Sequence, residues 1–250
     1  MSWEQLIKDL ESGSVRAANK VDGKWVANAE VKSGILEIFK AGHLANFTST
    51  AYPGFVDKHN LPVQEFTPEN NIRMVPGGSS VRAGSFVSSG VVIMPPAYIN
   101  IGAYVDSGSM VDSHALVGSC AQIGKNVHLS AAVQIGGVLE PVGMAPVVIE
   151  DNAFVGAGSV IVEGIQVLQN AVIAPGVTLS KAIPIYDAVN EKMITDYIIP
   201  ENAVVVPGTR PMSERYVWAK ERNLNLSCAI IIKYRDAKTD SSLVLEEALR

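Results

Sequence analysis

Apolar residues recur at every sixth position through the central part of the chain, with one interruption. Each of these marker positions holds Val, Ile or Leu: Val75, Val81, Val87, Ile93, Ile99, Val105, Val111, Val117, Ile123, Leu129, Ile135, Ile149, Val155, Ile161, Val167, Ile173 and Leu179. β-Branched residues suit an extended, half-buried backbone, but one apolar residue in six cannot alternate along a flat strand. The pattern therefore predicts very short strands joined by turns, which is typical of a β-helix of hexapeptide repeats.

Small residues often precede the markers by two positions, as do Ser109, Ala115 and Ala121, and they fit tight corners. Three hexapeptides then form one triangular coil of about 18 residues. Successive coils stack through backbone hydrogen bonds at a spacing of roughly 4.8 Å, so that the markers form ladders inside the prism. The repeats predict between five and six such coils.

The interruption lies between Ile135 and Ile149, which are fourteen positions apart, one hexapeptide plus eight residues. The intervening residues 136–147 are rich in glycine and proline, which mark turns and loops. We therefore expect a loop extruded from a corner of the prism. A long loop on a rigid scaffold is a candidate functional element.

The segment before the hexapeptides, residues 1–72, is predicted to form a small α-helical domain and a connector. Apolar residues at helical spacing begin at Trp3, and a second helical pattern runs over residues 28–40. Because a solenoid leaves strand edges open at its ends, we expect these helices to cap the first coil. Residues 43–72 hold three prolines and little periodicity, which predicts an ordered connector.

The β-helix is expected over residues 73–182, followed by a C-terminal region over residues 183–250. The predicted elements of that region are a hairpin or excursion at 186–197, a last coil edge at 198–206, a strand at 226–234 and a short helix at 240–250. The fold class is thus mainly β, a parallel β-helix with a small N-terminal α-helical domain and a C-terminal cap of strand and helix.

Composition limits the function classes. The chain of 250 residues carries a net charge of −5, which gives no support to nucleic-acid binding. It has neither an apolar run long enough for a membrane span nor the basic and apolar regions of a signal peptide. Its two cysteines, Cys120 and Cys228, form no disulfide framework. We expect a cytoplasmic protein in which Cys120, at a small-residue corner position, is structural rather than catalytic.

Several longer runs are more specific than the hexapeptide itself, and together they cover most of the chain. They are residues 23–26, 35–39, 72–76, 94–106, 110–112, 117–130, 135–141, 149–152 and 236–239. These runs resemble the tetrahydrodipicolinate N-succinyltransferase family of the hexapeptide acyltransferase superfamily. The resemblance implies a left-handed coil, although general crossover rules alone favour right-handed turns. It also implies a homotrimer with sites between subunits.

The activity that the resemblance implies is transfer of a succinyl group from succinyl-CoA to the amino group of ring-opened tetrahydrodipicolinate, in diaminopimelate and lysine biosynthesis. Succinyl-CoA would be a co-substrate, and neither a permanently bound cofactor nor a metal is expected. An extended pantetheine arm suits a groove lined by backbone amides, which can also stabilise an oxyanion. We assign binding of this donor to Gly137, Ala157, Gly158 and Ala174.

The resemblance also implies roles for acidic and basic side chains. Asp112 matches the family's acidic site residue, and we expect it to act as the base or to orient the amine, which must be neutral to attack a thioester. Asp106, one marker earlier, is its nearest competitor. Arg73 matches a position that binds a substrate carboxylate, which suits a guanidinium. Glu140 in the extruded loop either completes a neighbour's site or is a solvated loop charge.

Two departures from the family pattern alter the expected pocket. The family's Arg-Ser-Glu run corresponds to residues 158–160, where both charged residues are missing and Val160 replaces the glutamate. The tryptophan that follows two places after Asp112 in the family is His114 here. Histidine titrates near neutral pH, so His114 either takes over proton transfer or only fills the tryptophan's space. Glu163 is a weaker candidate to replace the missing carboxylate.

Other functions stay open at this point. One is a related CoA-dependent acyltransferase that uses acetyl-CoA or another amino-acid acceptor. A second is a zinc enzyme with three histidine ligands, but only His114 and His128 lie in the hexapeptides, so the third ligand is missing. A third is a non-enzymatic scaffold, against which the extruded loop and the polar corners argue.

Overall fold

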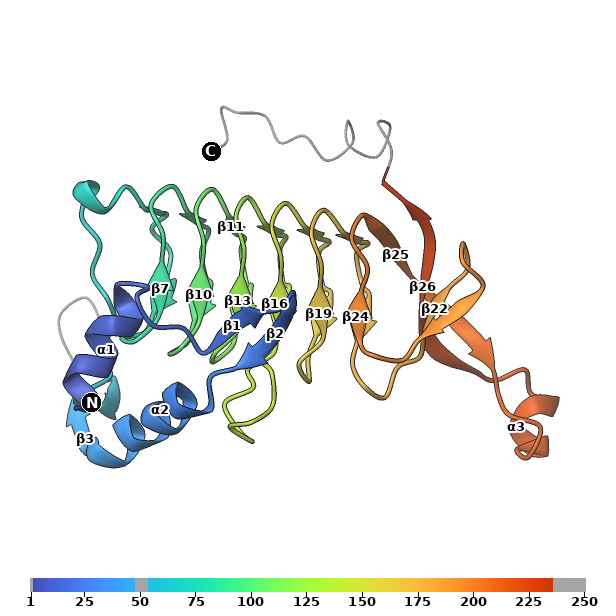
Figure 1. Ribbon diagram of the computed structural model, residues 1–250, viewed down its shortest axis with the longest axis horizontal. Coiled ribbons are helices and arrows are strands. Elements are labelled where there is room, and N and C mark those ends of the chain that lie inside the picture. Colours follow the sequence, from blue (N-terminus) through green and yellow to red (C-terminus); the bar gives the residue numbers. More distant parts are fainter. Residues whose placement is uncertain (1, 48–53, 236–250) are drawn as a thin grey trace.

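The computed structural model describes residues 2–47 and 54–235, and its central part is a prism of stacked coils with three parallel sheets as faces (Figure 1). We name the sheets A, B and C in the order in which the chain visits them. The chain turns from sheet A to B, from B to C and from C back to A at three corners. The parallel β-helix predicted from the hexapeptides is confirmed.

The strands of each sheet are two residues long in the coils. Sheet A contains β5 (Arg73–Met74), β8 (Val92–Ile93), β11 (Met110–Val111), β14 (His128–Leu129), β17 (Phe154–Val155) and β20 (Val172–Ile173). Sheet B contains β6 (Ser80–Val81), β9 (Tyr98–Ile99), β12 (Leu116–Val117), β15 (Gln134–Ile135), β18 (Val160–Ile161) and β21 (Thr178–Leu179). Sheet C contains β7 (Phe86–Val87), β10 (Tyr104–Val105), β13 (Gln122–Ile123), β16 (Val148–Ile149), β19 (Gln166–Val167) and β24 (Ile198–Ile199).

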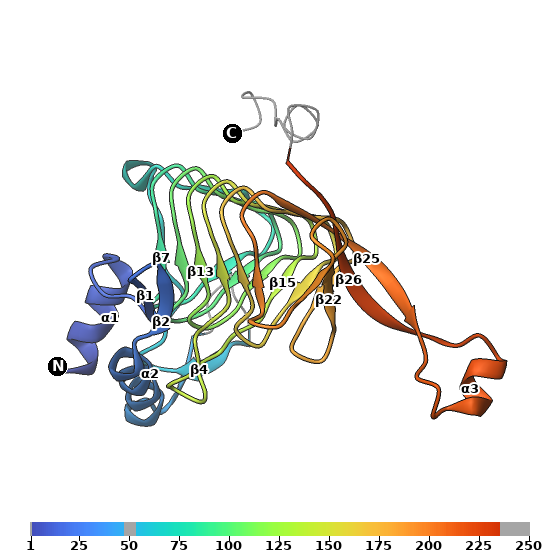
Figure 2. The ribbon, with the colours of Figure 1, turned by 45° about the vertical axis from the view of Figure 1, so that its right-hand side comes forward.

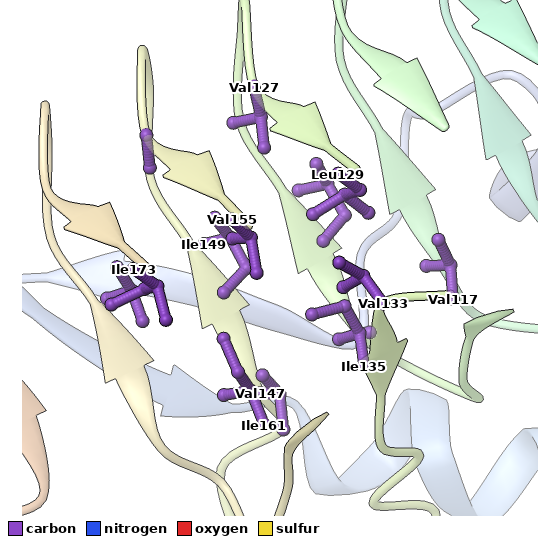
Figure 3. Close-up of a cluster of buried hydrophobic side chains, with 14 of the residues drawn as sticks. Val117, Val127, Leu129, Val133, Ile135, Val147, Ile149, Val155, Ile161 and Ile173 are labelled. Atoms are coloured by element: carbon purple, nitrogen blue, oxygen red, sulfur yellow. The ribbon is translucent and has the colours of Figure 1, made fainter. Parts of the chain in front are cut away.

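The marker residues pair with one another from coil to coil. Val111 is in register with Ile93 on one side and Leu129 on the other, 18 positions away in each direction. Where two paired strands lie on either side of the extruded loop the offset grows by eight, so that Leu129 pairs with Val155, and beyond the loop it returns to 18. The marker side chains are buried in a continuous core, part of which Figure 3 shows. Only the first marker is wrong, because Met74, not Val75, pairs with Ile93.

The N-terminal region contains more strand than the helical prediction allowed. Its helices are α1 (Trp3–Glu11) and α2 (Ala29–Ala41), and both were predicted. Its unpredicted elements are β1 (Ala18–Val21), β2 (Lys24–Ala27), β3 (Leu44–Asn46), β4 (Val56–Lys58) and the 3-10 helix η1 (Pro68–Asn70). Strands β1 and β2 form a hairpin whose turn residues Asp22 and Gly23 both have positive φ, the conformation that an Asp-Gly turn favours.

The helices lie against the side of the prism rather than over its first coil, so the predicted position of the cap is wrong (Figure 2). Leu6 and Ile35 belong to a second core that also contains Ile101 and Cys120, two residues of the corner between sheets B and C. Phe66 and Ile72, both in the connector, pack instead on the main core.

The C-terminal region extends sheet A. The predicted hairpin is β22 (Ile185–Asp187) with β23 (Lys192–Ile194), the coil edge is β24 continuing into β25, and the strand is β26. Strands β25 (Ala203–Pro211) and β26 (Asn225–Tyr234) form a long antiparallel arm, which was not predicted and carries α3 (Val217–Glu221) at its tip (Figure 2). The predicted helix at 240–250 lies outside the described residues. Across the part of the chain that the structure describes, no helix has the length and apolar character needed to cross a membrane.

Candidate active site

The corner between sheets A and B brings together five of the predicted site residues. Each coil contributes one turn to this corner, and backbone hydrogen bonds stack the turns. The N–H of Ala132 donates to Ser113 O at 2.8 Å. In the same way, the N–H of Gly158 donates to Ala131 O and that of Gly176 donates to Ala157 O, both at 2.9 Å. One edge of the prism therefore carries Asp112 and His114 on one coil, Ala131 and Ala132 on the next, then Ala157 and Gly158, and then Ala174.

Asp112 follows β11 directly and is half-buried. Its Oδ1 accepts the N–H of Ser113 at 2.7 Å, which fixes the side chain against its own turn. Among the described residues, its second carboxylate oxygen has no hydrogen-bond donor. The carboxylate is thus oriented by the backbone and keeps one oxygen for an amine.

His114 occupies the left-handed backbone region with φ of 62°, where histidine is more common than most residues. Its N–H donates to Pro96 O at 2.5 Å, and its carbonyl accepts the Gln134 side-chain amide at 3.1 Å. The imidazole is exposed and makes no hydrogen bond to Asp112 in the described chain. Its chemical role stays a prediction. Gln134, whose side chain lies beside this turn, was not singled out from the sequence.

Arg73 lies on the same face as the strand that precedes Asp112. It pairs with Val92, which pairs with Met110, so it stands two coils, or about 9.6 Å, from Met110. Its side chain is exposed on sheet A. This position fits a role in binding a substrate carboxylate near the corner, which stays a prediction.

Neither Val160 nor Glu163 supplies the missing carboxylate at this corner. Val160, at the position where the family has glutamate, pairs with Gln134 and Thr178 on sheet B. Glu163 lies at the next corner, between sheets B and C, where its Oε2 accepts the N–H of Lys181 at 2.7 Å. Glu163 therefore caps the following coil and does not reach the corner of Asp112.

Gly137 and Glu140 lie at the corner between sheets B and C, in the extruded loop between β15 and β16. A Cβ on Gly137 would stand 2.7 Å from Ser119 N, so only glycine fits this close approach. Glu140 is exposed. Within one chain, the width of sheet B thus separates these two residues from Asp112.

Asp106 lies at the third corner, between sheets C and A. It follows β10, and its Oδ1 accepts the N–H of Ser107 at 2.7 Å, the same local geometry as at Asp112. Because they face different corners, the two carboxylates of one chain cannot contact the same amine, and the choice of Asp112 over Asp106 stays a prediction.

The extruded loop is anchored to the N-terminal domain by a buried cation that the sequence reading missed. Lys32 of α2 is fully buried, and its Nζ donates to Pro141 O at 3.2 Å and to Met144 O at 2.7 Å. Burial lowers the pKa of Lys32 from its ordinary value. The signal in the sequence was a lysine adjacent to Val31 on the apolar face of a helix.

Cys120 is buried against the N-terminal helices, and burial raises the pKa of its thiol to about 12. The thiolate, which is the nucleophile, is therefore absent at neutral pH. We expect neither Cys120 nor the buried Cys228 to react rapidly with a thiol reagent such as dithionitrobenzoate in the native protein, and both to react in denaturant. A fast-reacting native thiol would contradict the structural role of Cys120.

The histidines do not gather into a metal site. His43 and His59 stack with ring centroids 4.0 Å apart in the region before the β-helix, whereas His114 and His128 lie in the coils. Within residues 2–47 and 54–235, no three His, Cys, Asp or Glu side chains are grouped so that they could hold a metal ion.

Two family profiles match parts of the chain. The profile described as the N-terminal part of tetrahydrodipicolinate N-succinyltransferase matches residues 2–40. The profile described as the hexapeptide repeat of succinyl-transferase matches residues 146–181. These segments correspond to the N-terminal domain and to the coils that follow the extruded loop.

Similar curated proteins span nearly the whole chain. The 2,3,4,5-tetrahydropyridine-2,6-dicarboxylate N-succinyltransferase of Ralstonia nicotianae is 43% identical over 249 residues, which is 98% of this chain and 87% of that protein. The protein of the same name from Burkholderia mallei is 45% identical over 248 residues, 98% of this chain and 86% of that protein. A solved N-succinyltransferase structure from Campylobacter jejuni has 15% identity and a TM-score of 0.45, and this chain spans 62% of its length. On the sequence relatives and the two profiles, the chain belongs to the tetrahydrodipicolinate N-succinyltransferase family.

Proposed function

We propose that this protein transfers the succinyl group of succinyl-CoA to the amino group of ring-opened tetrahydrodipicolinate, a step of diaminopimelate and lysine biosynthesis. The observation that carries the proposal is the corner between sheets A and B. There a backbone-oriented carboxylate, Asp112, stands in one column with the small residues Ala157, Gly158 and Ala174. Relatives that share 43–45% identity over the whole chain bear the name of this activity.

In the proposed mechanism Asp112 accepts a proton from the substrate ammonium or holds the neutral amine by a hydrogen bond. The amine nitrogen attacks the thioester carbonyl, and backbone N–H groups of the corner turns stabilise the resulting oxyanion. This attack forms the C–N bond, and collapse of the tetrahedral intermediate re-forms the carbonyl and breaks the C–S bond. The departing thiolate takes up the proton that the nitrogen loses. Arg73 pairs with a substrate carboxylate.

The proposed assembly is a cytoplasmic homotrimer. Gly137 and Glu140 lie one corner away from Asp112, so they reach the same substrate only if the corner between sheets B and C of a second copy packs against the Asp112 corner of the first. Such a head-to-tail contact closes into a ring under three-fold symmetry. Each site would then be built from two subunits, with the extruded loop of one copy beside the column of small residues of its neighbour.

Residues 158–160 lack the arginine and the glutamate of the family pattern. The identity of the acyl donor is therefore the first property to test. We expect thiol release in the presence of tetrahydrodipicolinate to show a kcat/KM at least about 10-fold higher with succinyl-CoA than with acetyl-CoA, a difference of about 1.4 kcal/mol. A succinyl carboxylate is a binding group that acetyl lacks, and a site that binds it discriminates strongly. Equal rates with both donors, or turnover with acetyl-CoA alone, would favour the alternative of a related CoA-dependent acyltransferase.

A further inference from the structure

A cavity of about 250 Å³ lies between the β1–β2 hairpin and sheet C, at a corner other than that of Asp112. Figure 1 shows this hairpin crossing β13 and β16 of the prism. The residues that matter in its lining are Arg16, Lys20, Trp25, Lys125 and Glu150. Its volume lies below the usual range of drug-sized pockets, so it suits a small ligand.

Glu150 is the anchor of this cavity. Its side chain is 5% exposed, and its Oε1 accepts Lys20 Nζ at 2.6 Å and Trp25 Nε1 at 2.8 Å. Its second oxygen, Oε2, is buried and has no hydrogen-bond partner. A buried carboxylate oxygen without a donor is costly and calls for an explanation. The Glu150 carboxylate, which lines the cavity, therefore favours a cationic group of a ligand there.

Arg16 provides the opposite charge. Its guanidinium carbon stands 3.6 Å from the centre of the Tyr104 ring, and its Nε donates to Gln122 Oε1 at 2.9 Å. In the described chain its terminal nitrogens have no hydrogen-bond acceptor. Burial lowers the pKa of Arg16, yet arginine keeps its charge in proteins. Two donors in a fixed fork are thus left for a carboxylate.

The charges of the lining balance. Its cations are Arg16, Lys20 and Lys125, and its anions are Asp106, Glu150 and Asp151. Such a lining favours a ligand that carries both charges over a simple anion or cation. We propose that the cavity binds a free α-amino acid, whose ammonium group pairs with the carboxylate of Glu150 and whose carboxylate accepts from the terminal nitrogens of Arg16. This site is independent of the proposed acyltransfer and involves none of its residues.

The test is calorimetric titration of the full chain with L-alanine, L-glutamate and L-lysine, without CoA thioesters. We expect saturable binding of at least one amino acid with one site per chain. The controls are analogues of the amino acid that binds, each of which keeps only one of its two charged groups; for alanine these are propionate and ethylamine. Each analogue should bind at least 10-fold more weakly than its parent amino acid. If none of the three amino acids binds saturably, or if an analogue binds as well as its parent, the proposal is wrong.

Variants locate the binding. Glu150→Gln removes the negative charge that pairs with the ammonium group, and it should weaken binding at least 10-fold. Glu191→Gln, which changes an exposed carboxylate between β22 and β23, should not weaken it. If Glu150→Gln does not fold, Lys125→Ala at the exposed rim should weaken binding about threefold through the lost carboxylate attraction. Binding that is lost in Asp112→Asn but unchanged in the cavity variants would place the amino acid at the acyltransfer site and overturn the inference.

Discussion

Replacement of Asp112 by asparagine is expected to lower kcat for succinyl transfer by about 10²–10⁴-fold, the usual contribution of a general base. Asparagine keeps the side-chain oxygen that accepts the Ser113 N–H and nearly the same volume, so the corner should keep its shape. It cannot take a proton from the substrate amine. The rate of thiol release from succinyl-CoA with tetrahydrodipicolinate measures the effect, and the thermal midpoint checks that the variant is folded.

Asp196→Asn is the matched control, because this exposed carboxylate also accepts a backbone N–H close by in sequence, that of Ile198, but lies in the C-terminal region. The Asp196→Asn variant should keep the kcat of the unaltered protein for succinyl transfer. His114→Gln separates the two possible bases of the corner. Full activity of Asp112→Asn together with a large loss in His114→Gln would transfer the role of base to His114.

The coils were predictable because a single geometric rule governs them. Residues 18 positions apart stack, so each buried marker such as Val111 must fit a marker above and below it. The prediction was wrong for the first marker, Val75, which lies where this stacking constraint is weakest. Strand β5 has a partner strand on one side only, β8, and its register there is shifted by one residue.

The same rule separates the candidate carboxylates and could have been applied to the sequence. Residues six positions apart, such as Asp106 and Asp112, fall on successive corners and not in one site. The resemblance to the family points to Asp112 but carries no information on this rotation. The Asp22-Gly23 turn was likewise a usable local signal for the β1–β2 hairpin.

The position of the N-terminal domain could not be predicted, because it depends on contacts between distant segments. The clearest sign of it in the sequence is Ile101, an apolar residue two places after the marker Ile99. Ile101 lies at a corner that faces outward from the coil, where it packs on the N-terminal helices. The cavity around Glu150 depends on the same docking. Lys20 and Trp25 reach Glu150 across 130 and 125 positions of the chain, and no local pattern encodes such contacts.

Replacement of Lys32 by methionine is expected to lower the free energy of unfolding by about 2–4 kcal/mol, since hydrogen bonds from charged donors are strong and their loss leaves buried acceptors unpaired. Methionine fills much of the same space, but Pro141 O and Met144 O lose their donor. The extruded loop would then be held less firmly to α2. Because Gly137 and Glu140 lie in this loop, we also expect kcat/KM for succinyl transfer to fall about 10-fold.

Urea unfolding measures the first effect, and limited proteolysis should cut the variant within residues 136–147 faster than the unaltered protein. Lys40→Met on the same helix is the control, because Lys40 is exposed and forms a surface ion pair with Glu37, so its loss should change the free energy of unfolding far less. If Lys32→Met were as stable as Lys40→Met, the two carbonyl contacts would contribute nothing. If it were destabilised but fully active, the loop would be structural, and the proposal that Glu140 completes a neighbouring site would lose its support.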